Sequence, residues 1–480
     1  MHSDTVTPLG RAPFVPVLLT WSAALYLYGN GFPASAAVAV SLILLILVIC
    51  LAASMKRPPG FWTVVLLLAA VSVSGASFLL YRLAPTPPRS LNHGAISLQG
   101  VVTGERAWGG KRAVTISTGG CDYFSEVWPR ISLREGEKVT VHGTIRPLDP
   151  ELSADEFDAD AYWGARGMDG EIENPELVSS KSSEPGIHSW RTLLRIRMIR
   201  TLPPLLRGHL EAAWLGVRDP LVADLHRKWG TSHLLAVSGF HVGIVVSLVF
   251  LLAGGWKYRR PFASAVLWFY VLLAGAAASA LRAALMIQSA FLGAWLGRPA
   301  SPLNGVAIAA GALLLWNPLW FWDLGWRLSV TAALLLSALS QERSALVWMI
   351  ASPLVWFATA PLIAGSFGSV PMAGLLVNPL ALPVFGILLP AASVLAVPAL
   401  VGAPGGAIMA RAAEMMIGGW ANLADMISLA APWSTGDSHF LHCAAAGLTI
   451  AVVFRGAGFG SLRSLAVMVC IVVLAVLAAN

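Results

Sequence analysis

The sequence predicts a mainly α-helical, polytopic membrane protein with about 11–13 transmembrane helices and one small, external β-barrel of the OB type. The first observation is composition: 56% of the 480 residues are hydrophobic and 12% are charged, whereas soluble domains carry about 25% charged residues. The second is charge placement. Residues 91–186 hold 16 acidic and 9 basic residues, and the rest of the chain holds 9 acidic and 23 basic residues. These observations exclude an ordinary soluble enzyme and predict a water-exposed domain between membrane segments.

Four consecutive parts are expected. Residues 1–85 form N-terminal transmembrane helices, residues 90–182 form the external β domain, residues 187–228 form a basic amphipathic juxtamembrane region, and residues 229–480 form a second membrane domain. The four cysteines include no CxxC pair, so neither a zinc site nor a disulfide framework is predicted.

The N-terminal part contains three apolar runs. Lys56 and Arg57 lie between the second and third runs, and the positive-inside rule makes that loop cytoplasmic. The third run then delivers the charged block to the outside. The first run could instead be a signal peptide cleaved near Ala34-Ser35-Ala36, but a second span follows it almost without a spacer. The runs lie near residues 13–30, 34–54 and 61–82.

The charged block reads as short strands. Residues 96–102, 113–116 and 138–145 are β-branched and partly alternating, with Gly-rich turns between them. Several short strands in a block of this length favour a small Greek-key barrel of the OB type, with a small sandwich as the alternative. Residues 187–215 follow with five arginines among apolar residues, a pattern typical of a helix on a membrane surface or of a solvated helix that bridges two domains.

The second membrane domain is nearly continuous. Eight prolines fall within residues 353–405, and they indicate either broken helices around a water-filled cavity or kinked structural helices. The expected spans lie near residues 231–255, 262–280, 283–298, 303–317, 321–340, 345–366, 371–401, 407–430, 439–455 and 461–479.

The start of this domain, TSHLLAVSGFHVG over Thr231–Gly243, is unusually polar for a membrane helix. Polar groups at membrane depth face a bundle interior or a water-filled path, or they hold helices together through hydrogen bonds. Ser238 and His241 could also form a nucleophile pair, although no acid is placed beside them. On a regular helix His233 and His241 would lie about 12 Å apart, too far to share one metal ion.

This run resembles the THLLAISGLHVGL-like signature of the ComEC-type competence family. Further patches resemble the same family in the same order, and together they extend over roughly residues 90–385. Arg327 stands where the family usually has Gln. The matching residues of the signature are His233, Leu234, Leu235, Ala236, Ser238, Gly239, His241 and Gly243, and the further patches are Phe157-Asp158, Tyr162, Arg166-Gly167, Leu281-Arg282-Ala283, Leu296-Gly297-Arg298, Pro302-Leu303-Asn304, Asn317-Pro318, 322–329 and 374–383.

Members of this family carry transforming DNA into bacteria. The resemblance therefore implies a passage for single-stranded DNA through the bacterial cytoplasmic membrane, with no enzymatic activity, cofactor or metal. Most members also carry a metallo-β-lactamase-like domain, but no H-x-H-x-D-H motif occurs among the ten histidines, so no nuclease activity is expected. The sequence has no P-loop. A separate cytoplasmic ATP-driven motor and a separate DNA receptor are therefore the expected partners, besides DNA and membrane lipid.

Two sets of residues are candidates for contact with DNA. Since Asp323 lies four residues before Arg327, the two should pair on one helix face, which leaves Arg282 as the candidate for touching phosphate. A membrane hydrolase using Ser238 and His241, or a scaffold that transports nothing, are the alternative functions. The candidates for the path through the membrane are His233, Ser238, His241, Arg282, Asp323, Arg327 and Asn378.

In the external domain, aromatic side chains could stack bases while basic side chains follow phosphates. The block's net negative charge opposes this role, so a purely structural domain is an equal alternative. The candidates there are Arg106, Trp108, Lys111, Arg112, Tyr162 and Arg166.

Overall fold

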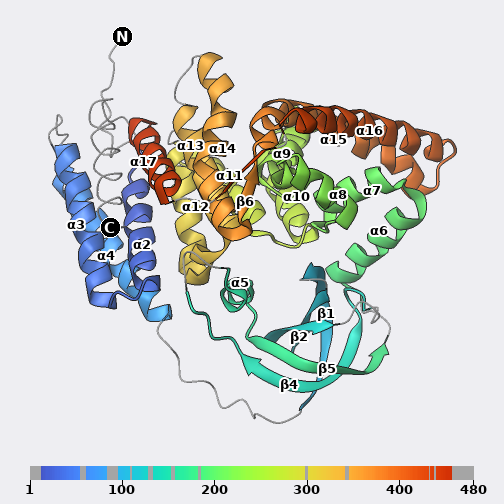
Figure 1. Ribbon diagram of the computed structural model, residues 1–480, viewed down its shortest axis with the longest axis horizontal. Helices are drawn as coiled ribbons and strands as arrows, with labels where there is room; N and C mark the ends of the chain where they lie inside the picture. Colours follow the sequence, from blue (N-terminus) through green and yellow to red (C-terminus); the bar gives the residue numbers. More distant parts are fainter. Residues whose placement is uncertain are drawn as a thin grey trace.

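The computed structural model combines a broad layer of helices with a β-barrel that lies on one side of it (Figure 1). The residues that the structure describes are 12–53, 61–83, 96–108, 111–127, 133–152, 157–181, 185–297, 301–340, 345–431, 433–436 and 439–456. The expected span at residues 461–479 lies outside them, as do Lys56 and Arg57.

The barrel is closed by five strands in the order β1-β2-β3-β5-β4. Neighbouring strands are antiparallel except β3 and β5, which pair in parallel at Tyr123 and Phe124. This is an OB-like arrangement, so the barrel prediction is confirmed and the sandwich alternative is wrong. The strands are β1 (Ile96–Trp108), β2 (Lys111–Thr118), β3 (Cys121–Val127), β4 (Lys138–Pro147) and β5 (Gly170–Lys181), and α5 (Ala159–Ala165) lies between β4 and β5.

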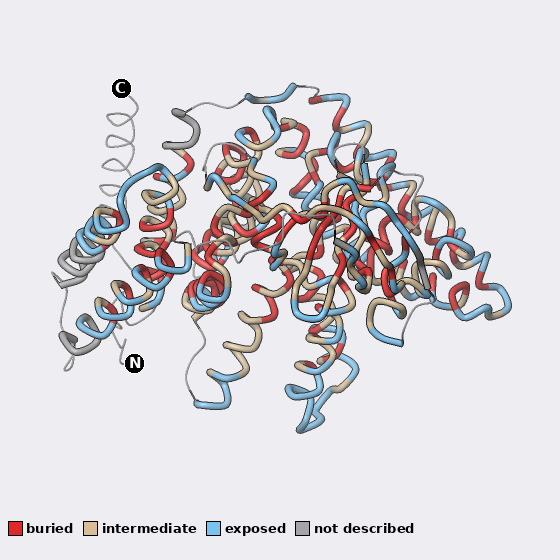
Figure 2. The backbone as a smooth tube through the Cα atoms, turned by 90° about the horizontal axis from the view of Figure 1, so that it is seen from below, coloured by how far each residue is buried: buried red, intermediate tan, exposed pale blue. Residues whose placement is uncertain are grey.

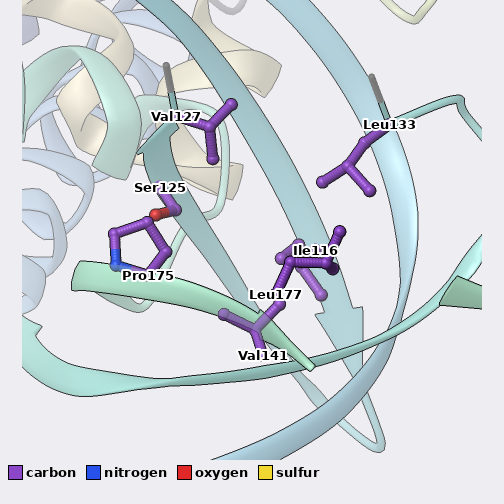
Figure 3. A pocket seen from close by; sticks show the side chains of 7 residues that line it. All are labelled: Ile116, Ser125, Val127, Leu133, Val141, Pro175 and Leu177. Carbon is purple, nitrogen blue, oxygen red and sulfur yellow. The ribbon is translucent and has the colours of Figure 1, made fainter. Parts of the chain in front are cut away.

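Apolar side chains that alternate along the strands fill the barrel, with Val102, Val114 and Val141 among them. A cavity of about 10 Å³ remains at one end (Figure 3). Its lining is apolar apart from Ser125, whose hydroxyl donates to the Ile172 carbonyl oxygen at 2.7 Å. A space of that size holds at most one water molecule, so the barrel interior is a packed core and not a ligand site.

The three largest hydrophobic clusters among the described helices join different sets of helices. The first joins the N-terminal helices to α12 (Pro302–Trp316) and α13 (Leu324–Leu339), and Trp21 of α2 (Phe14–Gly29) donates from Nε1 to the Ser72 carbonyl oxygen of α4 (Phe61–Leu83) at 3.1 Å. A Cβ atom at Gly75 would collide with the Trp21 ring, so this contact needs glycine. The second cluster packs α15 and α16 against α6 and α7, and the third contains α9, α10 and α11.

The helix bounds follow the expected spans closely, except at the start of the second membrane domain. The helices are α2 (Phe14–Gly29), α3 (Ala34–Ala53), α4 (Phe61–Leu83), α6 (Ile187–Thr201), α7 (Pro204–Leu210), α8 (Pro220–Lys228), α9 (Gly239–Ala253), α10 (Arg259–Leu273), α11 (Ala278–Trp295), α12 (Pro302–Trp316), α13 (Leu324–Leu339), α14 (Ala345–Phe367), α15 (Ala373–Val401), α16 (Gly406–Ala430) and α17 (His439–Gly456). Short π or 3₁₀ turns are η1 (Glu211–Leu215), η2 (Ser232–Leu234) and η3 (Pro318–Trp322), and two short strands, β6 (Ser369–Pro371) and β7 (Ser434–Gly436), pair with each other.

Two of the described helical segments, Leu66–Leu83 and Ala373–Val401, are long and apolar enough to cross a membrane, and seven shorter ones are apolar. The 29-residue helix α15 stays continuous through four internal prolines, so these four prolines do not break a helix, while β6 separates α14 from α15 within the proline-rich stretch. Large apolar side chains cover the outer faces of the helices, where exposed residues dominate (Figure 2). Leu252 and Ile387 are 78% and 75% exposed.

Helix α6 connects the barrel to the helical layer (Figure 1). Arg191 pairs through Nε with Glu135 Oε2 at 2.7 Å and also donates to the Leu273 carbonyl oxygen of α10. On the other side of the barrel, Asn317 Nδ2 donates to the Gly164 carbonyl oxygen of α5 at 2.7 Å. These contacts agree with the bridging interpretation of this basic helix, and they fix the barrel to the helical layer at two separate points.

Candidate nucleic-acid interface

Three arginines surround one tyrosine where the barrel meets the helical layer. Arg106 of β1 donates a hydrogen bond to the Tyr162 hydroxyl, and its guanidinium carbon lies 5.8 Å from the centre of the Tyr162 ring. Arg166, which caps the C-terminus of α5, stacks over the same ring at 3.5 Å and donates to the Tyr162 carbonyl oxygen at 2.8 Å. We call Arg106, Tyr162, Arg166 and the nearby Arg218 the arginine–tyrosine cluster.

Arg218 joins this cluster from the loop between η1 and α8; the residue is exposed as a whole, while its guanidinium group is packed among protein atoms. Burial of the guanidinium lowers the pKa of Arg218, and the nearby charges of Arg106 and Arg166 lower it further, whereas Tyr162 acts in the opposite direction. Within the described part of the chain, Asp323 is the one carboxylate that pairs with any of the three, at 2.8 Å from Arg166. The cluster therefore holds positive charge in excess and attracts anions.

Aromatic rings border the cluster. The centre of the Trp108 ring lies 5.0 Å from that of Tyr162 and 5.8 Å from that of Phe157. Phe157 is 58% exposed, and Trp108 and Tyr162 are half-buried, whereas Trp163 behind them is buried. Exposed rings beside unneutralised guanidinium groups are what a single strand uses for stacking and for phosphate contact.

Two of the basic residues predicted from the sequence do not belong to this surface. Lys111 Nζ pairs with Glu126 Oε2 at 2.6 Å, and Arg112 pairs with Glu105. Neighbouring carboxylates on β1 and β3 thus already pair with both β2 side chains, and contact of Lys111 and Arg112 with DNA stays a prediction.

The face next to the cluster is acidic. A hollow of about 300 Å³ at the start of α5 is lined by Asp149, Glu151, Asp158 and Asp160, together with Arg146, Ala159 and the ring of Phe157, which thus separates the cluster from these carboxylates. Arg146 donates from Nη1 to Asp160 Oδ2 at 2.7 Å, and this hydrogen bond holds the pKa of Asp160 below its usual value. An anionic strand would be repelled there and confined to the cluster.

Sequence reasoning missed Arg218 and Phe157 as candidates. Asp219 and Pro220 form a helix-start signal, since Asp219 Oδ1 accepts from the Leu221 N–H at 3.0 Å and Pro220 opens α8. That signal places Arg218 in the loop just before a helix. The sequence alone does not show that this loop lies close to the barrel.

The polar run at the start of the second membrane domain is not a regular helix. Residues 232–234 form the turn η2, residues 235–238 form a loop, and α9 begins at Gly239. The 12 Å separation expected for His233 and His241 rested on a regular helix and does not apply. His233 has an exposed side chain, whereas His241 is 4% exposed.

Ser238 and His241 lie side by side at the N-terminus of α9. The distance from Ser238 Oγ to His241 Nδ1 is 3.2 Å, and the Ser238 N–H donates to the same nitrogen at 3.3 Å. Because Nδ1 accepts this N–H, the neutral ring carries its proton on Nε2. Ser238 and His241 form a capping arrangement around the first turn of α9. Their mutual contacts involve no carboxylate that would orient His241 as a general base.

The other predicted path residues lie on separate elements. Arg282 of α11 is 5% exposed, and its Nη1 donates to the Ser329 carbonyl oxygen of α13. Asn378 of α15 is 9% exposed, and its Nδ2 lies 3.5 Å from the Gly230 carbonyl oxygen. A Cβ atom at Gly230 would lie 2.7 Å from Gly374 Cα, so the turn before η2 presses directly on the start of α15.

Asp323 and Arg327 do not form the expected pair. Asp323 Oδ1 caps α13 by accepting from the Trp326 N–H at 2.9 Å, while Oδ2 faces Arg166. Arg327 donates from Nε to the Phe321 carbonyl oxygen at 2.7 Å and stacks on the Phe321 ring. The acid expected to neutralise Arg327 instead connects the helical layer to the arginine–tyrosine cluster.

Comparison with known proteins identifies the second half of the chain. Residues 218–477 match the Competence family, described as "Competence protein". The chain belongs to this family. "ComE operon protein 3" of Bacillus subtilis (strain 168) is 35% identical over 146 residues, which cover 28% of this chain and 19% of the relative. No solved structure matches the chain. The resemblance to ComEC-type competence proteins is thereby confirmed, and it points to a role in competence and DNA uptake.

Proposed function

We propose that this competence protein forms a passage for single-stranded DNA through the bacterial cytoplasmic membrane, with its barrel on the outer side. Membership of the Competence family supports the role in DNA uptake. The exposed apolar faces of the helices support a multi-pass position in lipid. The observation that carries the proposal is the arginine–tyrosine cluster, which lies where a strand leaving the barrel would enter the helical layer.

In this proposal the cluster receives the strand. Bases stack on Trp108, Tyr162 and Phe157, and phosphates approach Arg106 and Arg218, whose charges are not neutralised by carboxylates in the described part of the chain. The paired cations elsewhere on the barrel leave its remaining surface acidic. The strand is thereby guided toward the helices and not around the barrel.

Energy for the movement comes from other proteins in this proposal. The sequence lacks a phosphate-binding loop for ATP, so a cytoplasmic motor pulls the strand and a separate receptor delivers it. Lipid contacts the apolar helix faces. In this proposal the polar residues His233, Ser238, His241, Arg282 and Asn378 line the route across the helical layer.

Substitution of Arg218, which lies in the loop between η1 and α8, tests this assignment. Arg218→Ala should lower the uptake of labelled DNA about tenfold at unchanged protein abundance, because a good phosphate contact is worth on the order of 1–2 kcal/mol. The salt dependence of oligonucleotide binding by the purified protein should weaken by about one unit of slope. Lys111→Ala is the matched control, since it removes a cation that Glu126 already pairs, and it should leave both measurements unchanged. Equal losses in the two variants would contradict the assignment.

A further inference from the structure

One buried cation in the helical layer has no carboxylate partner among the described residues. The Arg282 side chain is 5% exposed, its Nη1 donates to the Ser329 carbonyl oxygen, and its Nε finds no hydrogen-bond partner in the described chain. Asp323, the acid expected to pair with Arg327, pairs with Arg166. A buried guanidinium without a counter-charge is costly unless an anion completes its environment.

This guanidinium faces the beginning of a helix. A Cβ atom at Gly239, the first residue of α9, would lie 4.0 Å from Arg282 Nη2 and 3.5 Å from Ala283 Cβ. The first N–H groups of an α-helix have no intrahelical acceptor, and the positive end of the helix dipole favours an anion there. The Ser238 side chain contacts His241 Nδ1 and forms a capping box with His241, and neither contact uses the N–H groups of Gly239 and Phe240.

We propose that Arg282 and the N-terminus of α9 form a binding site for a phosphate group. Arg282 Nη2 and the first N–H groups of α9 donate to its oxygens, and the absence of a side chain at Gly239 provides the space between them. Given the passage proposed above, on which this step rests, the ligand in transport is a phosphodiester of the DNA strand. A lipid headgroup carries the same chemistry, and the experiment separates the two sources.

Gly239→Ala is the decisive variant because it fills the site without disturbing the packing. Its methyl group makes only ordinary contacts, and alanine favours a helix over glycine. Gly243→Ala is the matched control one turn along the same helix, where a Cβ atom meets nothing within 4 Å. Arg282→Lys keeps the charge but removes the planar pair of donors.

The probe is an abasic single-stranded phosphodiester oligomer, which carries phosphates without bases. Its binding to the purified protein is measured in micelles of a maltoside detergent, which carries no phosphate, with inorganic phosphate as competitor. We expect Gly239→Ala and Arg282→Lys to weaken binding about tenfold, and Gly243→Ala to bind like the wild type with an equal melting temperature. Unchanged binding in Gly239→Ala would overturn the site.

Three further measurements separate this site from the proposed function and from lipid. If the wild type takes up DNA but Gly239→Ala and Arg282→Lys do so equally well, the passage stands and the phosphate site is wrong. If inorganic phosphate protects wild type but not Gly239→Ala against thermal unfolding while no oligomer binds, the site stands and the passage is wrong. If added phosphatidylglycerol abolishes oligomer binding in wild type alone, the site holds a lipid phosphate, and the DNA assignment is overturned.

Discussion

The barrel and the helical layer differ in whether their positively charged side chains are paired with carboxylates. In the barrel, Lys111, Arg112 and Arg146 each pair with carboxylates of neighbouring strands or of α5. In the helical layer, Arg282 is buried without such a partner in the described chain. Exposed ion pairs contribute little to stability, so the barrel's pairs mainly cancel its cations. Cations that remain available to an anionic ligand occur at the junction and inside the layer.

Asp323 is the point where the two regions meet, and its loss should have the largest effect. Asp323→Ala removes both the helix cap of α13 and the ion pair with Arg166. We expect it to lower the free energy of unfolding by about 4 kcal/mol, of which the cap supplies about 1 kcal/mol and the buried pair the rest. Thermal unfolding of the purified protein measures the change.

Asp323→Asn is the matched variant because an amide oxygen still caps the helix while the charge is lost. It should retain about 1 kcal/mol more stability than Asp323→Ala. A melting temperature equal to that of the wild type would show that the pair with Arg166 does not stabilise the contact between the barrel and the helical layer. Asp323 would then not connect the two regions energetically.

The next effect comes from two buried histidines beneath α15. His209 Nδ1 donates to the Leu205 carbonyl oxygen at 2.8 Å, so its Nε2 accepts from His226 Nε2–H at 3.0 Å, and His226 Nδ1 accepts from the Thr231 hydroxyl at 2.8 Å. Burial lowers the pKa of His209 to about 4 and that of His226 to about 3. Both rings are therefore neutral in the folded protein at moderately acidic pH.

Since the unfolded chain takes up these protons near pH 6.5 and the folded chain only near pH 4, stability is lost as the pH falls through this window. Between pH 7.5 and 5.5 we expect a loss of about 3 kcal/mol from the pair. Melting temperatures at both pH values measure it. The double variant His209→Gln/His226→Gln should lose less stability between these two pH values than the wild type. The control His142→Gln, on the exposed face of β4, should lose as much as the wild type. An equal difference in all three proteins would place the acid sensitivity elsewhere.

Local patterns predicted the barrel and most helices, because alternation and apolar runs are read within a few residues. Strands β3 and β5 were missed, since Asp122 and Glu126 interrupt the apolar pattern of β3 and pairing with distant strands decides its structure. The pairing of Asp323 was mispredicted for the same reason. A neighbour four residues away was available to the local rule, but the chain fold brings Arg166 to the same carboxylate.

Arg327 should give the smallest effect, and it sharpens the contrast with Arg282. It is half-buried, and the interactions through Nε and the guanidinium face are with the carbonyl oxygen and ring of Phe321. Arg327→Gln restores the residue usual in the family and keeps an N–H donor for that carbonyl oxygen. We expect a loss of stability of about 0.5–1 kcal/mol and DNA uptake close to that of the wild type, scored against protein abundance.

Arg282→Lys in the same assay should reduce uptake even though its charge is kept. If Arg327→Gln instead abolishes uptake at normal abundance, the charge of Arg327 acts in the passage, and the contrast between Arg327 and Arg282 fails.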